Sequence, residues 1–446
     1  MRMTGAIVKG RAIARGGVAA TLSGMTLLAA GCGSAPGAPR AAQSASASTA
    51  ASAKAVVSSP AAPRTPAAPR TPAIAPSPDD TCKGAGTSTV QIASGSGTVP
   101  TLAAVQFVSA QRGWVAGSGR ILATSDGGQT WTRQYSGPAS LYQVDFISAT
   151  RGWAVGSNAV LTTMDGGKVW ASLPEPCTPI RSVHFMTPDL GYAVAGGSSV
   201  RLDGGVPATT GAGTLLMTTD GGQNWQPVPG APAAAQTVCF SSPLDGFLGT
   251  PGRVWRSTDG GRHWTVSFTE PRRSSTAVAS GEPGDTTVIE CAGDTAAWAL
   301  FLGSGAAMSH SPYLGYATQD ARDWHVLFEE EYTESAAVPG VHAPQGPGTY
   351  PGPFSAISPD SAAFVGWLPS EGLGAAPLEM VTGGGAGLSM RGDVGGVTQA
   401  YGVAFVSATQ GWVIGTDQTS PGKQGDYAIE ATSDGGRTWT RQYAAG

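Results

Sequence analysis

Groups able to do chemistry gather in irregular stretches of the chain, mostly in its second half. Carboxylates on two sides of a sugar can hydrolyse a glycosidic bond, and Glu329–Glu331 with Asp203 are the acids available for that reaction. Tyrosines and arginines among acids serve equally as contacts for a protein or glycan, which needs no defined carboxylate separation. The candidate binding residues are Arg272, Arg273, Tyr313, Glu330, Tyr332 and Tyr350.

Metal and cofactor motifs are not found in the sequence. No metal-ligand spacing relates the five histidines, which stand at positions 184, 263, 310, 325 and 342. The glycine-rich run 383–387 is not set between a strand and a helix, as a dinucleotide-binding loop would be. The sequence therefore predicts no metal and no cofactor.

One aspartate recurs in the motif Ser/Thr-x-Asp-Gly-Gly, which we call the Asp box. The stretch Thr124–Tyr135 returns at Thr432–Tyr443 with one residue changed. Its carboxylate can accept backbone N–H bonds and its glycines permit positive φ, so the box is typical of a tight turn. Each box has one local carboxylate, which is too few for a metal. We expect five structural, turn-forming aspartates: Asp126, Asp165, Asp220, Asp259 and Asp434.

A second landmark lies upstream of each box. It is an apolar residue followed seven positions later by an aromatic one. Around these landmarks each unit has four short stretches with period-2 patterning, and no amphipathic helix is apparent. Such units are typical of propellers, so we predict an all-β fold, a seven-bladed β-propeller of four-stranded blades over residues 81–446. We expect the tryptophans to pack between blades. The seven landmark pairs are Phe107/Trp114, Phe146/Trp153, Phe185/Tyr192, Phe240/Phe247, Cys291/Trp298, Ile357/Phe364 and Phe405/Trp412.

The Asp box resembles that of sialidase-type (BNR) repeats, and its combination with Gly-Trp is similar to the photosystem II assembly and stability factor family. The resemblance runs from about residue 101 to 446. It implies that the box lies between the third and fourth strands of a blade, away from any binding or catalytic centre. A sialidase would also need an arginine cluster, and the Arg-Ile-Pro motif that usually carries its first arginine is not present. Photosystem assembly itself is not implied, because nothing in the chain points to photosynthesis.

Insertions separate some units from the others. From the aromatic landmark to the Ser/Thr of the box there are 10 residues in three units, but 26, 20 and 20 in the third, fifth and seventh. Two further insertions follow the boxes of the fourth and fifth units. All of them fall between second and third strands or between blades, which emerge on one side of a propeller. Per-repeat insertions often mark the binding face, although neutral growth of surface loops would give the same pattern.

The amino terminus reads as an export signal, with four basic residues and then an apolar run. Residues 28–32, Leu-Ala-Ala-Gly-Cys, resemble the lipobox of bacterial lipoproteins, which implies that residues 1–31 are removed and Cys32 is acylated; an ordinary secretory signal is the alternative. Residues 32–80 are rich in Ala, Pro and Ser, and we expect a disordered tether. The predicted location is the outer face of the bacterial cell membrane, through a lipid anchor.

Four cysteines remain for disulfides in an exported chain: Cys82, Cys177, Cys239 and Cys291. Three pairings are possible, and Cys239 with Cys291 is favoured because both fall on first strands of neighbouring units. The formal net charge of −4 gives no basic footprint for nucleic acid. The sequence thus favours a monomeric, non-enzymatic binding or assembly scaffold with an unknown protein or glycan ligand, and a sialidase-like or other glycoside hydrolase is the alternative.

Overall fold

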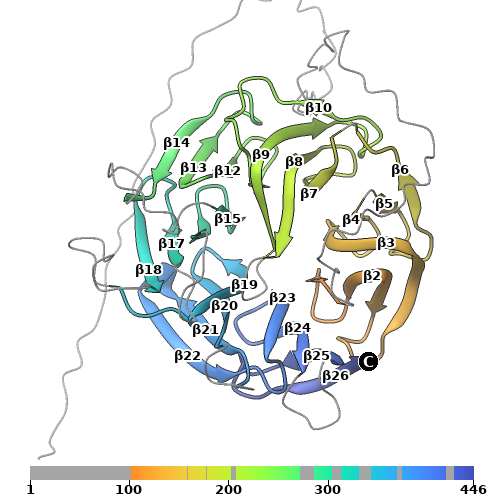
Figure 1. Cartoon of the computed structure of the whole chain (residues 1–446), viewed down its shortest axis with the longest axis vertical. Coiled ribbons are helices and arrows are strands. Elements are labelled where there is room, and N and C mark those ends of the chain that lie inside the picture. The colour runs from red at the N-terminus through yellow and green to blue at the C-terminus, as the bar shows by residue number, and fades with distance from the viewer. Residues whose placement is uncertain are drawn as a thin grey trace, which may run out of the picture. The chain divides into compact units, whose positions relative to one another are not determined.

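The computed structural model describes residues 102–157, 159–176, 178–201, 207–271, 286–303, 313–330, 343–368, 374–417 and 426–445. All of these lie in the compact unit Ala75–Gly446, whose strands follow one another around a ring (Figure 1). This part is all-β apart from 3-10 turns such as η4 (Gly383–Gly385), and it contains no helix long and apolar enough to cross a membrane. The predicted signal peptide and tether, residues 1–80, lie outside the described residues.

The first sheet is longer than the others. Its six strands pair in chain order, and β1 packs beside β23 and β24 of the last sheet, so the ends of the ring meet. The strands are β1 (Ala104–Phe107), β2 (Gly113–Thr124), β3 (Thr132–Phe146), β4 (Gly152–Gly156), β5 (Ala159–Thr163) and β6 (Ala171–Leu173).

Five four-stranded antiparallel sheets complete the ring. They comprise β7 (Ile180–Phe185), β8 (Gly191–Arg201), β9 (Pro207–Thr218) and β10 (Gln226–Pro227); β11 (Thr237–Phe240), β12 (Gly246–Thr250), β13 (Arg253–Ser257) and β14 (Thr265–Thr269); β15 (Thr286–Cys291), β16 (Ala297–Leu302), β17 (Tyr313–Thr318) and β18 (Trp324–Glu330); β19 (Tyr350–Ser358), β20 (Ser361–Trp367), β21 (Pro377–Thr382) and β22 (Gly387–Asp393); and β23 (Gln399–Phe405), β24 (Gly411–Asp417), β25 (Asp426–Thr432) and β26 (Thr440–Ala445).

The prediction of seven four-stranded blades is therefore wrong. Counted as hydrogen-bonded sheets over the described residues, the propeller has six blades, because the first sheet contains the first two repeat units. In that sheet β2 and β3 each span two strand positions. β3 runs unbroken because Pro138 is the one residue in it without a backbone N–H donor. Three prolines, Pro174, Pro176 and Pro179, lie instead between the second and third units, where the sheet ends. Repeat units, which the landmarks define, are thus more numerous than sheets.

The landmark of the sixth unit also needs correction. The spacing indicates Ile357, but Phe354 pairs with Phe364 in the register and the two rings stack 5.1 Å apart. Ser358 pairs with Ser361, so a tight turn replaces the longer link of the other units, and the register shifts beside Ile357. The seven-residue spacing from Ile357 to Phe364 therefore does not mark the same paired positions as in the other six units.

Antiparallel order gives the ring two different ends. First-to-second and third-to-fourth strand links leave at one end, which we call the Asp-box end. Second-to-third links and connections between units leave at the other, the looped end. The strands that flank each predicted insertion end and begin at the looped end, for example β16 and β17 on either side of residues 304–312, and β18 and β19 on either side of 331–342. In the third unit part of the insertion lengthens the β8–β9 hairpin, whose pairing extends to Arg201 and Pro207.

Candidate functional site

Each Asp box is a hydrogen-bonded turn at the Asp-box end. In the first, one Asp126 carboxylate oxygen accepts bonds from Thr124 Oγ1 at 2.8 Å and Thr130 N at 2.9 Å, and Gly128 N donates to Thr124 Oγ1. The Thr130 hydroxyl bonds the other oxygen, and these bonds lower the pKa of Asp126 to about 2. The two glycines, Gly127 and Gly128, have φ of 75° and 93°. The carboxylate is thus fully used within its own turn.

The other four complete boxes repeat this geometry, with the second glycine donating to the Ser or Thr at 2.8–2.9 Å. Nothing in these turns leaves a carboxylate for catalysis. Over the described part of the chain, no three His, Cys, Asp or Glu gather where they could hold a metal. The aspartates Asp126, Asp165, Asp220, Asp259 and Asp434 therefore shape turns.

The boxes also join neighbouring repeat units. Trp114 of the first unit stacks on Phe146 of the second at 3.5 Å, and its indole N–H points to Gly166 O in the second unit's box at 3.4 Å. The prediction that tryptophans pack between blades is confirmed by Trp153 of the first sheet, which stacks on Phe185 of the next sheet at 3.4 Å. We call these unit-to-unit contacts seams. Four of them, the regular seams, have a stacked aromatic pair: Trp114/Phe146, Trp153/Phe185, Tyr192/Phe240 and Trp412/Phe107.

The last of these stacks closes the ring. Trp412 of the seventh unit lies 3.5 Å from Phe107 of the first, and its Nε1 donates to Gly127 O at 3.1 Å. Gln442 Nε2 donates to the same carbonyl at 2.9 Å. Side chains at the Asp-box end therefore hold the two ends of the propeller together.

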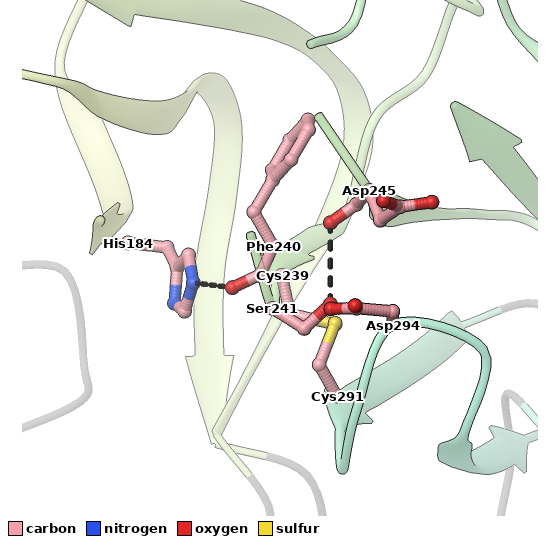
Figure 2. The surroundings of a disulfide bond; sticks show 7 residues. All are labelled: His184, Cys239, Phe240, Ser241, Asp245, Cys291 and Asp294. Carbon is pink, nitrogen blue, oxygen red and sulfur yellow. Dashed lines mark hydrogen bonds between the residues drawn. A yellow bond between two sulfur atoms is a disulfide. The ribbon is translucent and has the colours of Figure 1, made fainter. Parts of the chain in front are cut away.

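A second link joins neighbouring inner strands in several units, from the residue just before the landmark. Asp145 Oδ2 accepts a bond from Phe185 N at 2.7 Å, and Glu290 Oε2 accepts one from Ala356 N at 2.7 Å. His184 Nε2 lies 2.7 Å from Phe240 O (Figure 2). Burial raises the pKa of Asp145, against the opposing effect of His184, and raises the pKa of Glu290 to about 7.

A disulfide takes this position between the fourth and fifth units. Cys239, the residue before its landmark, bonds to Cys291, and their Cα atoms are 5.7 Å apart (Figure 2). This is the pair that the repeat positions favoured. Beside it, Ser241 Oγ donates to Asp294 Oδ1 at 3.1 Å across the same seam. The covalent bond thus replaces the hydrogen bond of the other seams, while Cys82 and Cys177 lie outside the described residues.

At the looped end, the fifth and sixth units bring two carboxyl groups beside one phenol. Tyr313 opens β17 and is the register partner of Glu330, which ends β18. Tyr313 is 1% exposed and donates its hydroxyl to Gly348 O at 2.7 Å. Burial raises the pKa of Tyr313 well above its usual range, and the charges of Glu330 and Glu379 add to this effect. The register places Glu330 beside Tyr313, and the charge of Glu379 also reaches that phenol.

Glu379 was not predicted from the sequence. It lies on β21, opposite Phe364 in the register, and is 5% exposed. Its signal in the sequence is a lone charge in the otherwise apolar segment Pro377–Thr382, a pattern unusual for a buried strand. Burial raises the pKa of Glu379 and that of Glu330 each to about 7.

The remaining predicted binding residues divide between described and undescribed parts. Tyr350 opens β19, is buried, and lies 5.0 Å from the ring of Trp367 at the same end. The structure thus brings Tyr313, Glu330 and Tyr350 to one end of two neighbouring units. Arg272, Arg273 and Tyr332, like Cys32, lie outside the described residues.

A second acid cluster lies in the seventh unit and contains its own cation. Arg441 donates Nη1 to Asp417 Oδ2 at 2.6 Å and Nε to Glu430 Oε1 at 2.7 Å. Asp417 is fully buried, so its carboxylate is paired with Arg441 inside the protein. It is a structural cluster, in contrast to the acids beside Tyr313.

Comparison with known proteins bears on the whole propeller. Residues 89–174 and 134–295 match the PSII_BNR family, described as photosynthesis system II assembly factor YCF48. A search of curated proteins finds no match. Among solved structures, YCF48 bound to D1 peptide is similar at 18% identity and a TM-score of 0.47, over 76% of this chain and 94% of that one.

Two GH74 structures are also similar. An ancestral GH74 enzyme has 13% identity and a TM-score of 0.52, over 78% of this chain and 47% of that one. The Niastella koreensis GH74 enzyme has 11% identity and a TM-score of 0.45, over 77% and 66%. At these identities the likeness concerns the fold alone. The resemblance drawn from the Asp box and Gly-Trp is confirmed by the family match, which identifies the repeats of residues 89–295 as those of the family of the photosynthesis system II assembly factor YCF48.

Proposed function

We propose that this protein is a non-enzymatic binding or assembly scaffold that holds a partner at its looped end. The observation that carries the proposal is the contrast between the two ends. The strands that flank the insertions all end and begin at the looped end, whereas the Asp-box end is occupied by turns and seam bonds. Long loops on a rigid framework are where binding concentrates. The match to an assembly-factor family supports the same function.

Site-specific photocrosslinking in the full-length exported protein tests which end binds. A photoreactive residue replaces Gln345, which is exposed at the looped end, or Met164, which is 75% exposed in an Asp box and serves as the matched control. We expect a discrete crosslinked partner from position 345 and none from position 164. Crosslinking from position 164 alone would contradict the proposal.

We further propose that a lipid on Cys32 holds the propeller at the outer face of the bacterial cell membrane. The support is the sequence Leu-Ala-Ala-Gly-Cys at residues 28–32, followed by the Ala/Pro/Ser-rich segment 32–80. Replacing Cys32 with Ser should release the protein into the medium. Retention of the variant in the membrane fraction would rule out the lipid anchor.

Glycoside hydrolysis is the second candidate, favoured by one observation. Burial raises the pKa of Glu330 and that of Glu379 to about 7, the range of a general acid, and the charges of both also raise the pKa of Tyr313. The test is hydrolysis of sialosides and plant-type glucans by the purified protein and by Glu379→Gln. Activity in the wild type that Glu379→Gln abolishes would favour the enzyme, and no activity in either would exclude it for these substrates.

A further inference from the structure

The second Asp box differs from the other complete boxes in the surface it exposes. Its turn carries two apolar side chains, Met164 and Val169, which are 75% and 66% exposed. At the same two positions the other complete boxes carry only Ser, Thr, Asn or His. Among the described residues these two are also the most exposed of the large apolar side chains. The apolar pair is therefore a property of this box and not of the motif.

Val169 also omits a contact that the other complete boxes have. There, the residue four positions after the aspartate bonds the second carboxylate oxygen through its side chain, as Thr130 does to Asp126 at 2.6 Å. The third, fourth and seventh boxes have the same contact. Valine has no donor in its side chain, so Val169 gives Asp165 only a backbone bond, at 3.0 Å. A local rule broken in favour of exposed apolar surface is typical of a binding site.

Basic side chains border this exposed pair. Lys168 lies in the same turn and is exposed. Arg112 of the first unit is partly exposed and donates Nη2 to Gly166 O in the box at 2.8 Å. The neighbouring link, residues 148–150, carries no charge, and the Asp165 carboxylate accepts bonds within its own turn. The tip of the second box is therefore apolar with a cationic border.

We propose that this tip, formed by Met164, Lys168 and Val169, inserts into the surface of an anionic lipid bilayer. The inference rests on the proposed lipid anchor, which would hold the propeller at a membrane. The tip is far smaller than the roughly 800 Å² per partner of a stable protein interface. Fluid lipid needs no matching surface, because apolar side chains enter the acyl boundary while Lys and Arg attract anionic headgroups.

Alone, this contact is weak and reversible, because only two apolar side chains enter the lipid. Cys32→Ser should therefore still be released into the medium. Together with the acyl anchor, the tip supplies a second membrane signal, and such pairs of signals give stable attachment. It also orients the propeller, with the Asp-box end toward the bilayer and the looped end free for a partner.

The test measures sedimentation of the full chain carrying Cys32→Ser, the parent, with vesicles of phosphatidylglycerol and phosphatidylcholine. No acyl group contributes in this chain, and the variants differ from it only at the tip. Met164→Ser with Val169→Thr restores the polar pattern of the first box and should weaken binding at least about tenfold. Lys168→Gln should weaken it about fivefold on these vesicles and leave binding to phosphatidylcholine alone unchanged.

Met390→Ser is the matched control. Met390 is 55% exposed on β22 of the sixth unit, and its variant should bind as the parent does. Val169→Thr returns the hydroxyl that bonds the aspartate in the first box, so the double variant should unfold at the same urea concentration as the parent or a higher one. Weaker binding without lower stability separates a lost lipid contact from a folding defect.

Four results would overturn the inference: no sedimentation of the parent, equal sedimentation of the parent and the double variant, an equal effect of Met390→Ser, or a discrete protein crosslinked from position 164. The outcome is separable from that of the lipid anchor. Release of Cys32→Ser into the medium without vesicle binding keeps the anchor and removes this contact. Tip-dependent vesicle binding by a Cys32→Ser chain that stays in the membrane fraction does the reverse.

Discussion

The regular seams and the seams around the fifth and sixth repeat units both join neighbouring units, but through different groups. In a regular seam such as Trp153/Phe185, an aromatic stack and a bond to a box glycine join the units. Around the fifth unit, a disulfide and the Glu290 carboxylate join the inner strands, and Trp298 donates to Ser358 O without a parallel stack. Where the Asp box is intact, the same stack and glycine bond therefore join the units. Where the box is lost, contacts particular to each seam replace them.

The irregular seams also adjoin the buried acids whose pKa values are raised to about 7. Tyr313 and Glu330 lie in the fifth unit, whose box is shortened to Thr318–Trp324, and Glu379 lies in the sixth, which keeps Gly383–Gly385 but has no box aspartate. A part of the ring that no longer follows the repeat can carry groups that the repeat excludes, such as a carboxyl in an apolar strand. The comparison thus separates a framework region from a region with a candidate site.

The largest expected effect concerns the regular stack. Trp153 is fully buried, lies 3.4 Å from Phe185 and donates to Gly221 O at 3.0 Å. Trp153→Ala should lower the free energy of unfolding by about 3–5 kcal/mol, because it removes a buried ring and leaves the carbonyl unpaired. Urea denaturation measures the change.

Trp298→Ala is the matched variant in an irregular seam. Trp298 is equally buried but lies edge-on to Phe364 at 6.4 Å. We expect a loss smaller by about 0.5–1.5 kcal/mol, the contribution of an aromatic pair beyond burial. Equal losses would show that the stack does not distinguish the two kinds of seam.

The disulfide should contribute somewhat less. Cys239→Ser with Cys291→Ser opens a link between residues 52 apart in sequence and should cost about 2–4 kcal/mol of unfolding free energy. Addition of a dithiol reductant should destabilise the wild type similarly and leave the double variant unchanged. If the double variant is as stable as the wild type, the disulfide contributes no more than the hydrogen bonds at the same position in the other seams.

The buried acids predict a pH dependence of stability. The pKa values of Glu290, Glu330 and Glu379 are raised to about 7, so the folded state holds protons that the unfolded state releases at lower pH. Their favourable contribution is present below about pH 4.5 and is lost as the pH rises to about 7.

Glu379→Gln should flatten that dependence by on the order of 3 kcal/mol at most and be more stable than the wild type at pH 8. Glu430→Gln, whose wild-type acid is paired with Arg441, should show no such gain. Denaturant unfolding at pH 5 and pH 8 measures both variants. A pH profile of Glu379→Gln parallel to that of the wild type would contradict the assignment.

The smallest effect should come from single Asp boxes. Asp126→Ala removes the bonds that Thr124 and Thr130 give the carboxylate, and a modest fall in Tm is expected. Because the pKa of Asp126 is lowered to about 2, its contribution disappears as the pH falls from about 4 to about 2. In the shortened box of the fifth unit, Asp320→Ala should lower Tm less than Asp126→Ala does. A larger fall would show that the shortened box still stabilises its turn as a complete box does.

Much of this structure could be read from local patterns. The Asp boxes, the aromatic landmarks and the place of each insertion follow from chain spacing, because turns and strand alternation are set by neighbouring residues. The pairing of Cys239 with Cys291 could be favoured on the same grounds. Ile357 was misread because a seven-residue spacing fits both a long link and a tight turn with a shifted register.

The sequence by itself determined the all-β class, the repeat and the looped end, since each depends on local periodicity and on the order of strands. Only the tertiary structure decided that two repeat units share one sheet, because hydrogen bonding along β3 depends on how the chain leaves the first unit. It alone brought Glu379 near enough to Tyr313 for its charge, like that of Glu330, to raise the pKa of the phenol. These residues are far apart in sequence, and their shared burial, which raises the pKa values of both acids, exists only in the packed ring.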